Sequence, residues 1–176
     1  MKNWKIDPTH SEVGFKVKHM MFTNVNGKFN EYDSQLQFDE NAFENANLGF
    51  KAAIASLDTN NVDRDNHLKS GDFFNAEQFP ELSFQSTQIK TSGDDYEITG
   101  DLTLHGVTKP VTLQAEYSGL MKDPWGNNKV GLNITGKINR KDFGLNYNAA
   151  LETGGVLIGE NVNLNIELQL IQENEG

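Results

Sequence analysis

Histidine is the residue type best suited to metal binding or acid–base chemistry in this 176-residue chain. His10, His19, His67 and His105 lie far apart, and no two have the spacing that pairs zinc ligands on one strand or helix. Cysteine is absent, which excludes disulfides, thiolate nucleophiles and cysteine metal sites. We therefore expect no metal. His10 and His19 fit hydrogen-bonded positions at the start and end of a strand. His19 could equally share the inward face of that strand with Phe15 and Val17 and provide a polar contact there.

A second group of reactive side chains crowds one short segment, where Arg64, Asp65 and His67 follow one another closely. One interpretation is a set of surface ion pairs that holds a helix on the rest of the fold. The other is a binding site for an anionic group such as a phosphate, because an arginine fork donates two parallel hydrogen bonds. Both interpretations stay open for Arg64 and for Arg140.

Recognised catalytic motifs are missing around these residues. Asp142-Phe143-Gly144 matches a kinase tripeptide but lacks the glycine loop, lysine strand and catalytic loop that give it a role. No nucleophile elbow or dinucleotide loop is present. We expect a protein that is not an enzyme.

The elements that must position these residues are mostly strands. Apolar residues alternate with polar ones in many segments, which is typical of antiparallel strands with one apolar face. Turn signals such as Asn26-Gly27, His105-Gly106 and Asp123-Pro124 separate them. We predict eight strands, with bounds good to a few residues, at roughly 4–7 plus 11–20, 28–38, 46–57, 82–91, 95–104, 107–120, 129–140 and 155–171.

Long antiparallel strands expose unpaired backbone at their edges, and closure into a barrel removes those edges. The stretch from Asn60 to Gly71 interrupts the strand pattern. It has an asparagine cap, acidic residues early and a lysine late, which predicts one short helix. Phe73, Phe74 and Phe79 follow it, so we expect the helix and these rings to cap one mouth of the barrel. An eight-stranded barrel is either filled by its own side chains or holds one ligand, and the alternation pattern does not choose.

The charge balance excludes some partners. Fifteen basic and 25 acidic residues give a net charge of −10, spread along the chain. Such a surface argues against nucleic acid and against simple electrostatic adhesion to anionic membranes. No apolar run is long enough for a signal peptide or a membrane span. We expect a single soluble domain over residues 1–176 in the cytoplasm, or a periplasmic or secreted one if an export signal has been removed.

Several fragments together resemble the YceI-like family of polyisoprenoid-binding, lipocalin-like barrels. They include Trp4-Lys5-Ile6-Asp7 and Val13-Gly14-Phe15 near the start and Gly27-Lys28-Phe29 after them. The most specific fragments are Arg64-Asp65-Asn66-His67-Leu68, Gly100-Asp101-Leu102-Thr103-Leu104-His105-Gly106 and Asp142-Phe143-Gly144. Their order and spacing extend over essentially the whole chain.

The resemblance implies an all-β, extended eight-stranded barrel with an apolar tunnel for a long isoprenoid, either a polyprenyl phosphate or a prenylated quinone. It implies binding, sequestration or transport, with the lipid as ligand and no other cofactor. The side chains expected to line the tunnel and its mouth are Phe15, Val17, His19, Phe50, Ile54, Arg64, His67, Leu68, Phe73, Phe74, Phe84, Leu102, Leu104, Leu113, Ile134, Arg140, Phe143, Leu164 and Ile166.

Two other hypotheses remain. The chain could be an enzyme that acts on a sequestered lipid through Arg64, Asp65 and His67. It could also be a ligand-free structural or stress-response scaffold with a solid core. A homodimer is compatible with either one and with a lipid binder.

Overall fold

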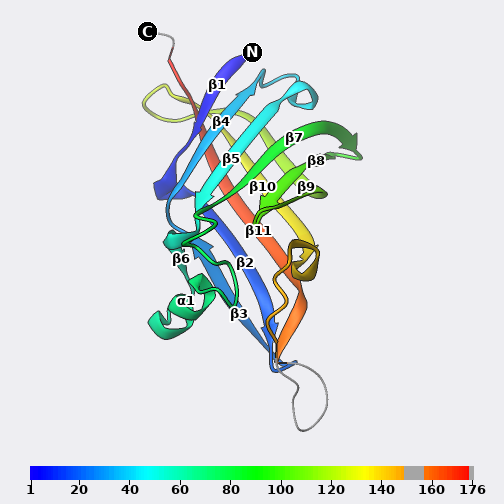
Figure 1. Cartoon of the computed structure of the whole chain (residues 1–176). Helices are drawn as coiled ribbons and strands as arrows, with labels where there is room; N and C mark the ends of the chain where they lie inside the picture. Colours follow the sequence, from blue (N-terminus) through cyan, green and yellow to red (C-terminus); the bar gives the residue numbers. More distant parts are fainter. Residues whose placement is uncertain (149–156, 175–176) are drawn as a thin grey trace.

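A single antiparallel sheet makes up most of the computed structural model, which describes residues 1–148 and 157–174. Eleven strands form this sheet (Figure 1). In chain order they are β1 (Lys2–Ile6), β2 (Glu12–His19), β3 (Thr23–Phe29), β4 (Tyr32–Phe38), β5 (Asn47–Ala53), β6 (Leu57–Asp58), β7 (Glu81–Ser92), β8 (Asp95–Leu104), β9 (Val107–Lys122), β10 (Asn128–Asn139) and β11 (Ile158–Gln172).

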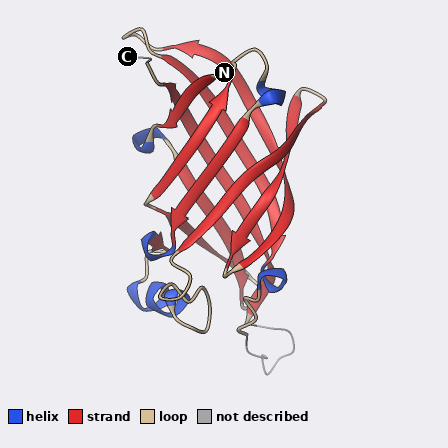
Figure 2. Cartoon of the chain, turned by 45° about the horizontal axis from the view of Figure 1, so that its top comes forward, coloured by secondary structure: helices blue, strands red, loops and turns tan. Residues whose placement is uncertain are grey.

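These strands occupy eight positions around a closed barrel (Figure 2). β1 and β2 both pair with β11, so together they fill one position. β3 and β4 share the next position, because β4 pairs with β1 and β3 pairs with β2. β5 and β6 share the one after it, because β5 pairs with β4 and β6 pairs with β3. The pairing of β1 with both β4 and β11 closes the ring. The predicted eight-stranded barrel is confirmed.

Short irregular segments divide these three positions. The 3₁₀ turn Pro8–His10 separates β1 from β2, and the 3₁₀ turn Ile54–Ser56 separates β5 from β6. Ser56 holds two of the breaks together. Its carbonyl and hydroxyl oxygens accept from the Asn30 N–H at 3.2 and 3.1 Å, and its hydroxyl donates to the Ala53 carbonyl at 2.7 Å. The strand predicted over 28–38 is therefore two strands, divided at residues 30–31.

The hairpin turn expected at Asn26-Gly27 is wrong. Both residues lie inside β3, where Gly27 pairs with Phe15, and the chain turns instead at Met20–Phe22. The reason is that Gly27 serves side-chain packing, not turn formation: the Phe15 ring covers the space that a Cβ would occupy. The first residues of the strand predicted over 155–171 lie outside the described part of the chain.

One α-helix, α1 (Val62–Lys69), lies at the end of the barrel away from β1, as Figure 1 shows. Asn61 caps it by accepting from the Arg64 N–H at 2.9 Å, which confirms the predicted helix and its asparagine cap. Within residues 1–148 and 157–174, no helix has the length and apolar character needed to cross a membrane.

Stacked rings fill the opposite end of the barrel. We call this group the aromatic plug; it consists of Trp4, Phe38, Phe43, Tyr96 and Tyr117. Trp4 stacks on Phe38 with centroids 4.8 Å apart, and Phe43 stacks on Tyr117 at 4.6 Å. The Trp4 indole donates to the Phe38 carbonyl at 3.1 Å, and the Tyr117 hydroxyl donates to the Glu40 carbonyl at 2.9 Å. The indole N–H of Trp4 and the hydroxyl of Tyr117 are thus satisfied inside an apolar cluster.

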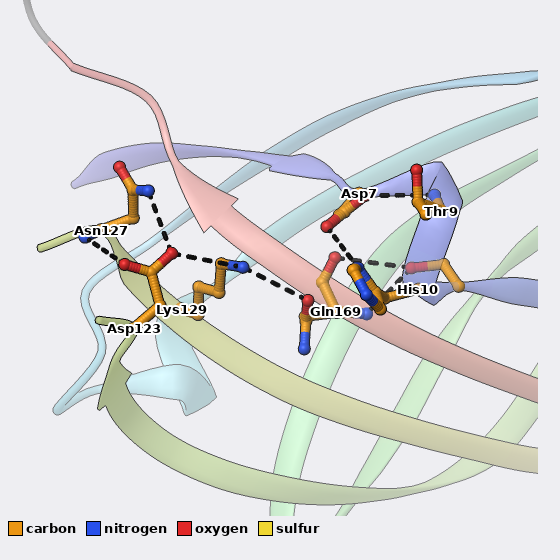
Figure 3. A network of polar contacts seen from close by, with 8 residues as sticks. Asp7, Thr9, His10, Asp123, Asn127, Lys129 and Gln169 are labelled. Carbon is orange, nitrogen blue, oxygen red and sulfur yellow. Dashed lines mark hydrogen bonds and ion pairs between the residues drawn. The ribbon is translucent and has the colours of Figure 1, made fainter. Parts of the chain in front are cut away.

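Polar side chains outside the barrel tie its first and last strands to the β9–β10 turn (Figure 3). Asp123 accepts from the backbone and side-chain N–H groups of Asn127 at 2.9 and 3.0 Å and pairs with Lys129 at 3.4 Å. The Lys129 ammonium also donates to Gln169 on β11 at 3.5 Å, and His10 bonds to Asp7 at 2.9 Å. This network holds the closing strands in register.

Candidate functional site: an apolar cavity with one open end

The interior of the barrel is hollow. A cavity of about 340 Å³ lies between the strands, and its walls are almost wholly apolar. Side chains from all eight barrel positions contribute, including Phe15 of β2, Phe50 of β5 and Leu113 of β9. The alternation of the sequence did not decide whether the barrel is solid or has room for a ligand. The packing shows that the barrel is not filled by its own side chains.

Three glycines on the inner face explain much of this space. A Cβ at Gly27, Gly100 or Gly136 would lie 2.3–2.4 Å from an atom of Phe15, Phe84 or Leu113 on the neighbouring strand. Each large side chain therefore lies flat over a glycine backbone instead of projecting across the lumen. Two rings and an isobutyl group remain against the wall, and the centre of the barrel stays free.

The cavity is long and closed at one end. Along β11 it runs from Ile158 to Leu168, about ten residues, which at a rise of about 3.3 Å and a tilt of about 40° spans roughly 25 Å of barrel axis. The aromatic plug fills the barrel beyond Leu168. At the other end the cavity reaches side chains that contact solvent, among them His67, which is 44% exposed.

Arg140 lies beside this open end and is 4% exposed. Its guanidinium donates to the carbonyls of Leu145 and Tyr147 at 2.6 and 2.9 Å and to those of Gly159 and Ile158 at 2.9 and 3.4 Å. Burial lowers the pKa of Arg140, and the nearby Glu160 opposes that shift. No carboxylate of the described residues forms an ion pair with it. A buried cation that is held by carbonyl dipoles and has no ion-pair partner among the described residues raises the local potential at the mouth.

The cluster on α1 is mainly structural. Arg64 donates to the hydroxyl and carbonyl oxygens of Thr59 at 2.7 and 2.5 Å. Asp65 accepts from the hydroxyl and backbone N–H of the same threonine at 2.6 and 2.9 Å. These bonds attach α1 to the end of β6, which agrees with the interpretation of a set that holds the helix on the barrel, although hydrogen bonds replace the expected ion pairs.

His67 faces the mouth in a different way. Its Nε2 lies 3.0 Å from Asp72 Oδ2, and its ring meets the edges of Phe73 and Tyr147 at centroid distances of 5.1 and 5.0 Å. The imidazole and two aromatic rings thus form one wall of the opening. Among the described residues, no three His, Asp or Glu side chains gather in a group that could hold a metal ion.

The residues predicted to line a tunnel come together in this cavity with two exceptions. Ile54 is 1% exposed in the turn between β5 and β6, where its N–H donates to the Pro80 carbonyl at 2.9 Å, and its side chain belongs to the surrounding core. Phe143 is also 1% exposed and borders a separate, polar hollow of about 250 Å³ between β9 and β10. Both lie in 3₁₀ turns, where the inward and outward alternation of a strand no longer applies.

Other lining residues were not predicted. Most lie on strands, at positions whose side chains the barrel turns inward; they are Ile6, Val13, Val25, Phe29, Leu36, Leu48, Leu82, Ile98, Val111, Leu132, Ile138, Val162 and Leu168. Leu145, Tyr147 and Leu157 lie outside regular strands, and no sequence pattern marks them. Only the fold brings them to the mouth.

Comparison with known proteins identifies the family. The YceI-like domain pattern matches residues 4–170. The chain belongs to the YceI-like family. A UPF0312 protein of Photorhabdus laumondii subsp. laumondii is 46% identical to it over 151 residues, which cover 85% of this chain and 78% of that relative. The resemblance drawn from the sequence fragments is confirmed.

Two solved structures share the barrel fold. The crystal structure of a YCEI protein of Campylobacter jejuni is 37% identical and covers 99% of this chain and 100% of its own, with a TM-score of 0.77. A polyisoprenoid binding domain from Saccharophagus degradans is 14% identical, with a TM-score of 0.70 over 98% of this chain and 100% of its own. At that identity the likeness to the Saccharophagus domain establishes the fold alone.

Proposed function

We propose that this YceI-like barrel binds one long isoprenoid chain in its cavity, with the polar head at the open end. The observation that carries the proposal is the shape of the cavity: an apolar channel of roughly 25 Å, closed by the aromatic plug and bordered at its mouth by the buried cation of Arg140. The name of the Saccharophagus structure supports the same class of ligand.

The energetics favour a long chain. Each buried methylene contributes about 0.8 kcal/mol, so one five-carbon isoprene unit contributes roughly 3–4 kcal/mol. Association and ordering cost an estimated 4–15 kcal/mol. A few units therefore exceed that cost without any polar contact. Binding needs no catalytic group, and the contacts of Arg64 and Asp65 with Thr59 leave them committed to structure.

The head group that fits this mouth is an anion. Arg140 attracts negative charge in a partly desolvated setting, where charge–charge interactions are stronger than in water. His67 and Tyr147 can add hydrogen bonds at the rim. We therefore favour a polyprenyl phosphate over a prenylated quinone, and we propose sequestration or transport of that lipid as the role.

Native mass spectrometry of the protein tests the proposal. The protein is extracted, refolded and offered a polyprenol and its monophosphate of equal length. We expect one chain per barrel, with the phosphate binding roughly tenfold more tightly because of Arg140. Equal affinities would show that the head lies in bulk water, and failure of both chains to bind would reject the proposal.

Adjacent residues of β11 provide a matched pair of variants. Leu164 lines the cavity, whereas Asn165 is exposed on the outer face. The Leu164→Trp side chain should fill the lumen and abolish uptake, while Asn165→Trp should leave uptake unchanged. Uptake that survives Leu164→Trp in a folded protein would place the chain elsewhere.

A further inference from the structure

The turn between β2 and β3 holds three apolar side chains in solvent. Met20, Met21 and Phe22 are 47%, 52% and 85% exposed. Met20 and Met21 have φ angles of 53° and 69°, in the left-handed region that methionine rarely adopts. The Met20 N–H donates to the Leu157 carbonyl at 2.7 Å, which fixes the turn. Large apolar groups kept in water by an unfavourable backbone indicate a contact beyond the chain itself.

This turn adjoins the open end of the cavity. His19, the last residue of β2, pairs with Ile158 of β11, and both side chains line the cavity. Val25 on β3 and Leu157 line it as well. Figure 1 shows the turn at the same end of the barrel as α1 and far from β1, which forms part of the closed end. The exposed tip and the mouth therefore face the same way.

The segment that carries this turn is basic, in contrast to the whole chain. Residues 13–30 contain Lys16, Lys18 and Lys28 and no aspartate or glutamate, in a chain of net charge −10. Lys16 and Lys18 are exposed on β2, where Phe15, Val17 and His19 alternate inward, and Lys18 also borders the open end of the cavity. An apolar tip flanked by lysines is an arrangement that binds the interface of an anionic bilayer.

We propose that the β2–β3 turn docks the barrel on a bilayer that contains anionic phospholipid. The side chains of Met20, Met21 and Phe22 enter the interface, and Lys16 and Lys18 contact the head groups. This surface lies outside the cavity. Docking is therefore distinct from the proposed binding of an isoprenoid chain, and it can be measured with no isoprenoid present. Docking directs the mouth at the bilayer, which lets an apolar chain enter the barrel without crossing water.

The other end of the barrel supplies a control. Met121 and Trp125, beside the β9–β10 turn, are 61% and 83% exposed, but they adjoin the end closed by the aromatic plug. Apolar exposure alone would make both ends adhere to lipid equally. The proposal requires adhesion through the β2–β3 turn only.

Vesicle flotation measures the docking. We expect the protein to float with vesicles of equal parts phosphatidylcholine and phosphatidylglycerol, and more weakly with phosphatidylcholine alone. The combined change Met20→Asn, Met21→Asn and Phe22→Ser should weaken binding roughly tenfold or more, because three apolar side chains leave the interface. Asparagine tolerates the left-handed backbone, so the turn should persist. The combined change Met121→Ser and Trp125→Ser should leave flotation unchanged.

Two further readouts make the proposal falsifiable. Lys16→Gln and Lys18→Gln should each weaken binding to the anionic vesicles roughly fivefold and reduce its salt dependence. In the double variant Trp125→Phe, Phe22→Trp, the maximum of tryptophan fluorescence emission should shift to shorter wavelength when the protein docks. Protein that never floats, equal loss of flotation from both ends, or self-association that the tip variant abolishes would each overturn docking. If the tip variant still takes up an isoprenoid chain from detergent solution, only the docking proposal fails, and the proposed binding of the chain stands.

Discussion

At the scale of single residues, the free volume of this barrel depends on where side chains are missing. Gly27, Gly100 and Gly136 each lie beneath a larger residue of the neighbouring strand. The benzyl groups of Phe15 and Phe84 therefore rest against backbone. A residue with a Cβ at any of these positions would compete with a ring for the same space, and the ring would have to move into the lumen.

Gly27→Ala tests this arrangement. The new Cβ would lie 2.3 Å from the Phe15 ring, so the ring must swing inward. We expect the free energy of unfolding to fall by about 1–3 kcal/mol and the longest chain accepted to become shorter. Urea denaturation and chain uptake with polyprenols of increasing length measure the two effects.

Gly131→Ala is the matched control for that variant. Gly131 is also in a strand, but a Cβ there would meet only Ser118, at an ordinary distance of 3.5 Å. The longest polyprenol that the Gly131→Ala variant accepts should be the same as for the unmodified protein. If Gly27→Ala accepted the same chains as Gly131→Ala, the glycines would not determine the width of the lumen.

At the scale of elements, hairpins and turns are held by short polar networks outside the barrel. The β9–β10 turn depends on Asp123 (Figure 3). The Asn127 side chain, the backbone N–H groups of Asn127 and Trp125, and Lys129 together lower the pKa of Asp123 to about 2. The folded protein therefore binds this proton more weakly than the unfolded chain does, whose carboxyl titrates near 3.8.

Acid stability should report this network. The contribution of Asp123 is fully present above about pH 4 and is lost as the pH falls toward about 2, because protonation favours the unfolded chain. Asp123→Asn keeps the acceptor oxygen but cannot titrate, so its stability should fall less between pH 4 and pH 2. Urea unfolding at both pH values checks this. A parallel loss in both proteins would contradict the assignment, and Asp94→Asn in the exposed β7–β8 turn controls for the change in net charge.

At the scale of the whole molecule, the ends of the chain close the barrel. Trp4 of β1 pairs with Leu36 of β4 and with Gln172 of β11, so the first strand bridges two distant parts of the sequence. Because these contacts span most of the chain, we expect folding on a millisecond-to-second timescale, which is typical of barrels rich in non-local pairing. The same tryptophan belongs to the aromatic plug that makes the cavity one-ended.

Trp4→Ala should therefore act on both closure and the plug. The indole is 2% exposed and stacks on Phe38, so we expect a loss of about 3–5 kcal/mol in the free energy of unfolding. Trp125→Ala removes a tryptophan that is 83% exposed and should change stability by no more than about 0.5 kcal/mol. Guanidinium denaturation followed by circular dichroism compares the two. Similar midpoints for both variants would show that the plug does not support the fold.

Much of the fold could be predicted from local pattern. Alternation placed eight strands and identified which side chains face inward, because the direction of a side chain in a strand depends only on its position. The capped helix was likewise local: Asn61, early acidic residues and a late lysine are neighbours in sequence. The family resemblance rested on the same short fragments in order.

Tertiary structure alone decided the features that join distant residues. Whether the barrel is hollow depends on Gly27 meeting Phe15 and Gly136 meeting Leu113 across strand pairs, which no single segment encodes. The Asn26-Gly27 signal failed for the same reason, since packing took precedence over turn propensity. The mouth is assembled from Arg140, Tyr147 and Leu157 with α1, segments that only closure of the sheet brings together. Local chemistry determines elements, whereas volume and contacts between strands determine what the barrel can hold.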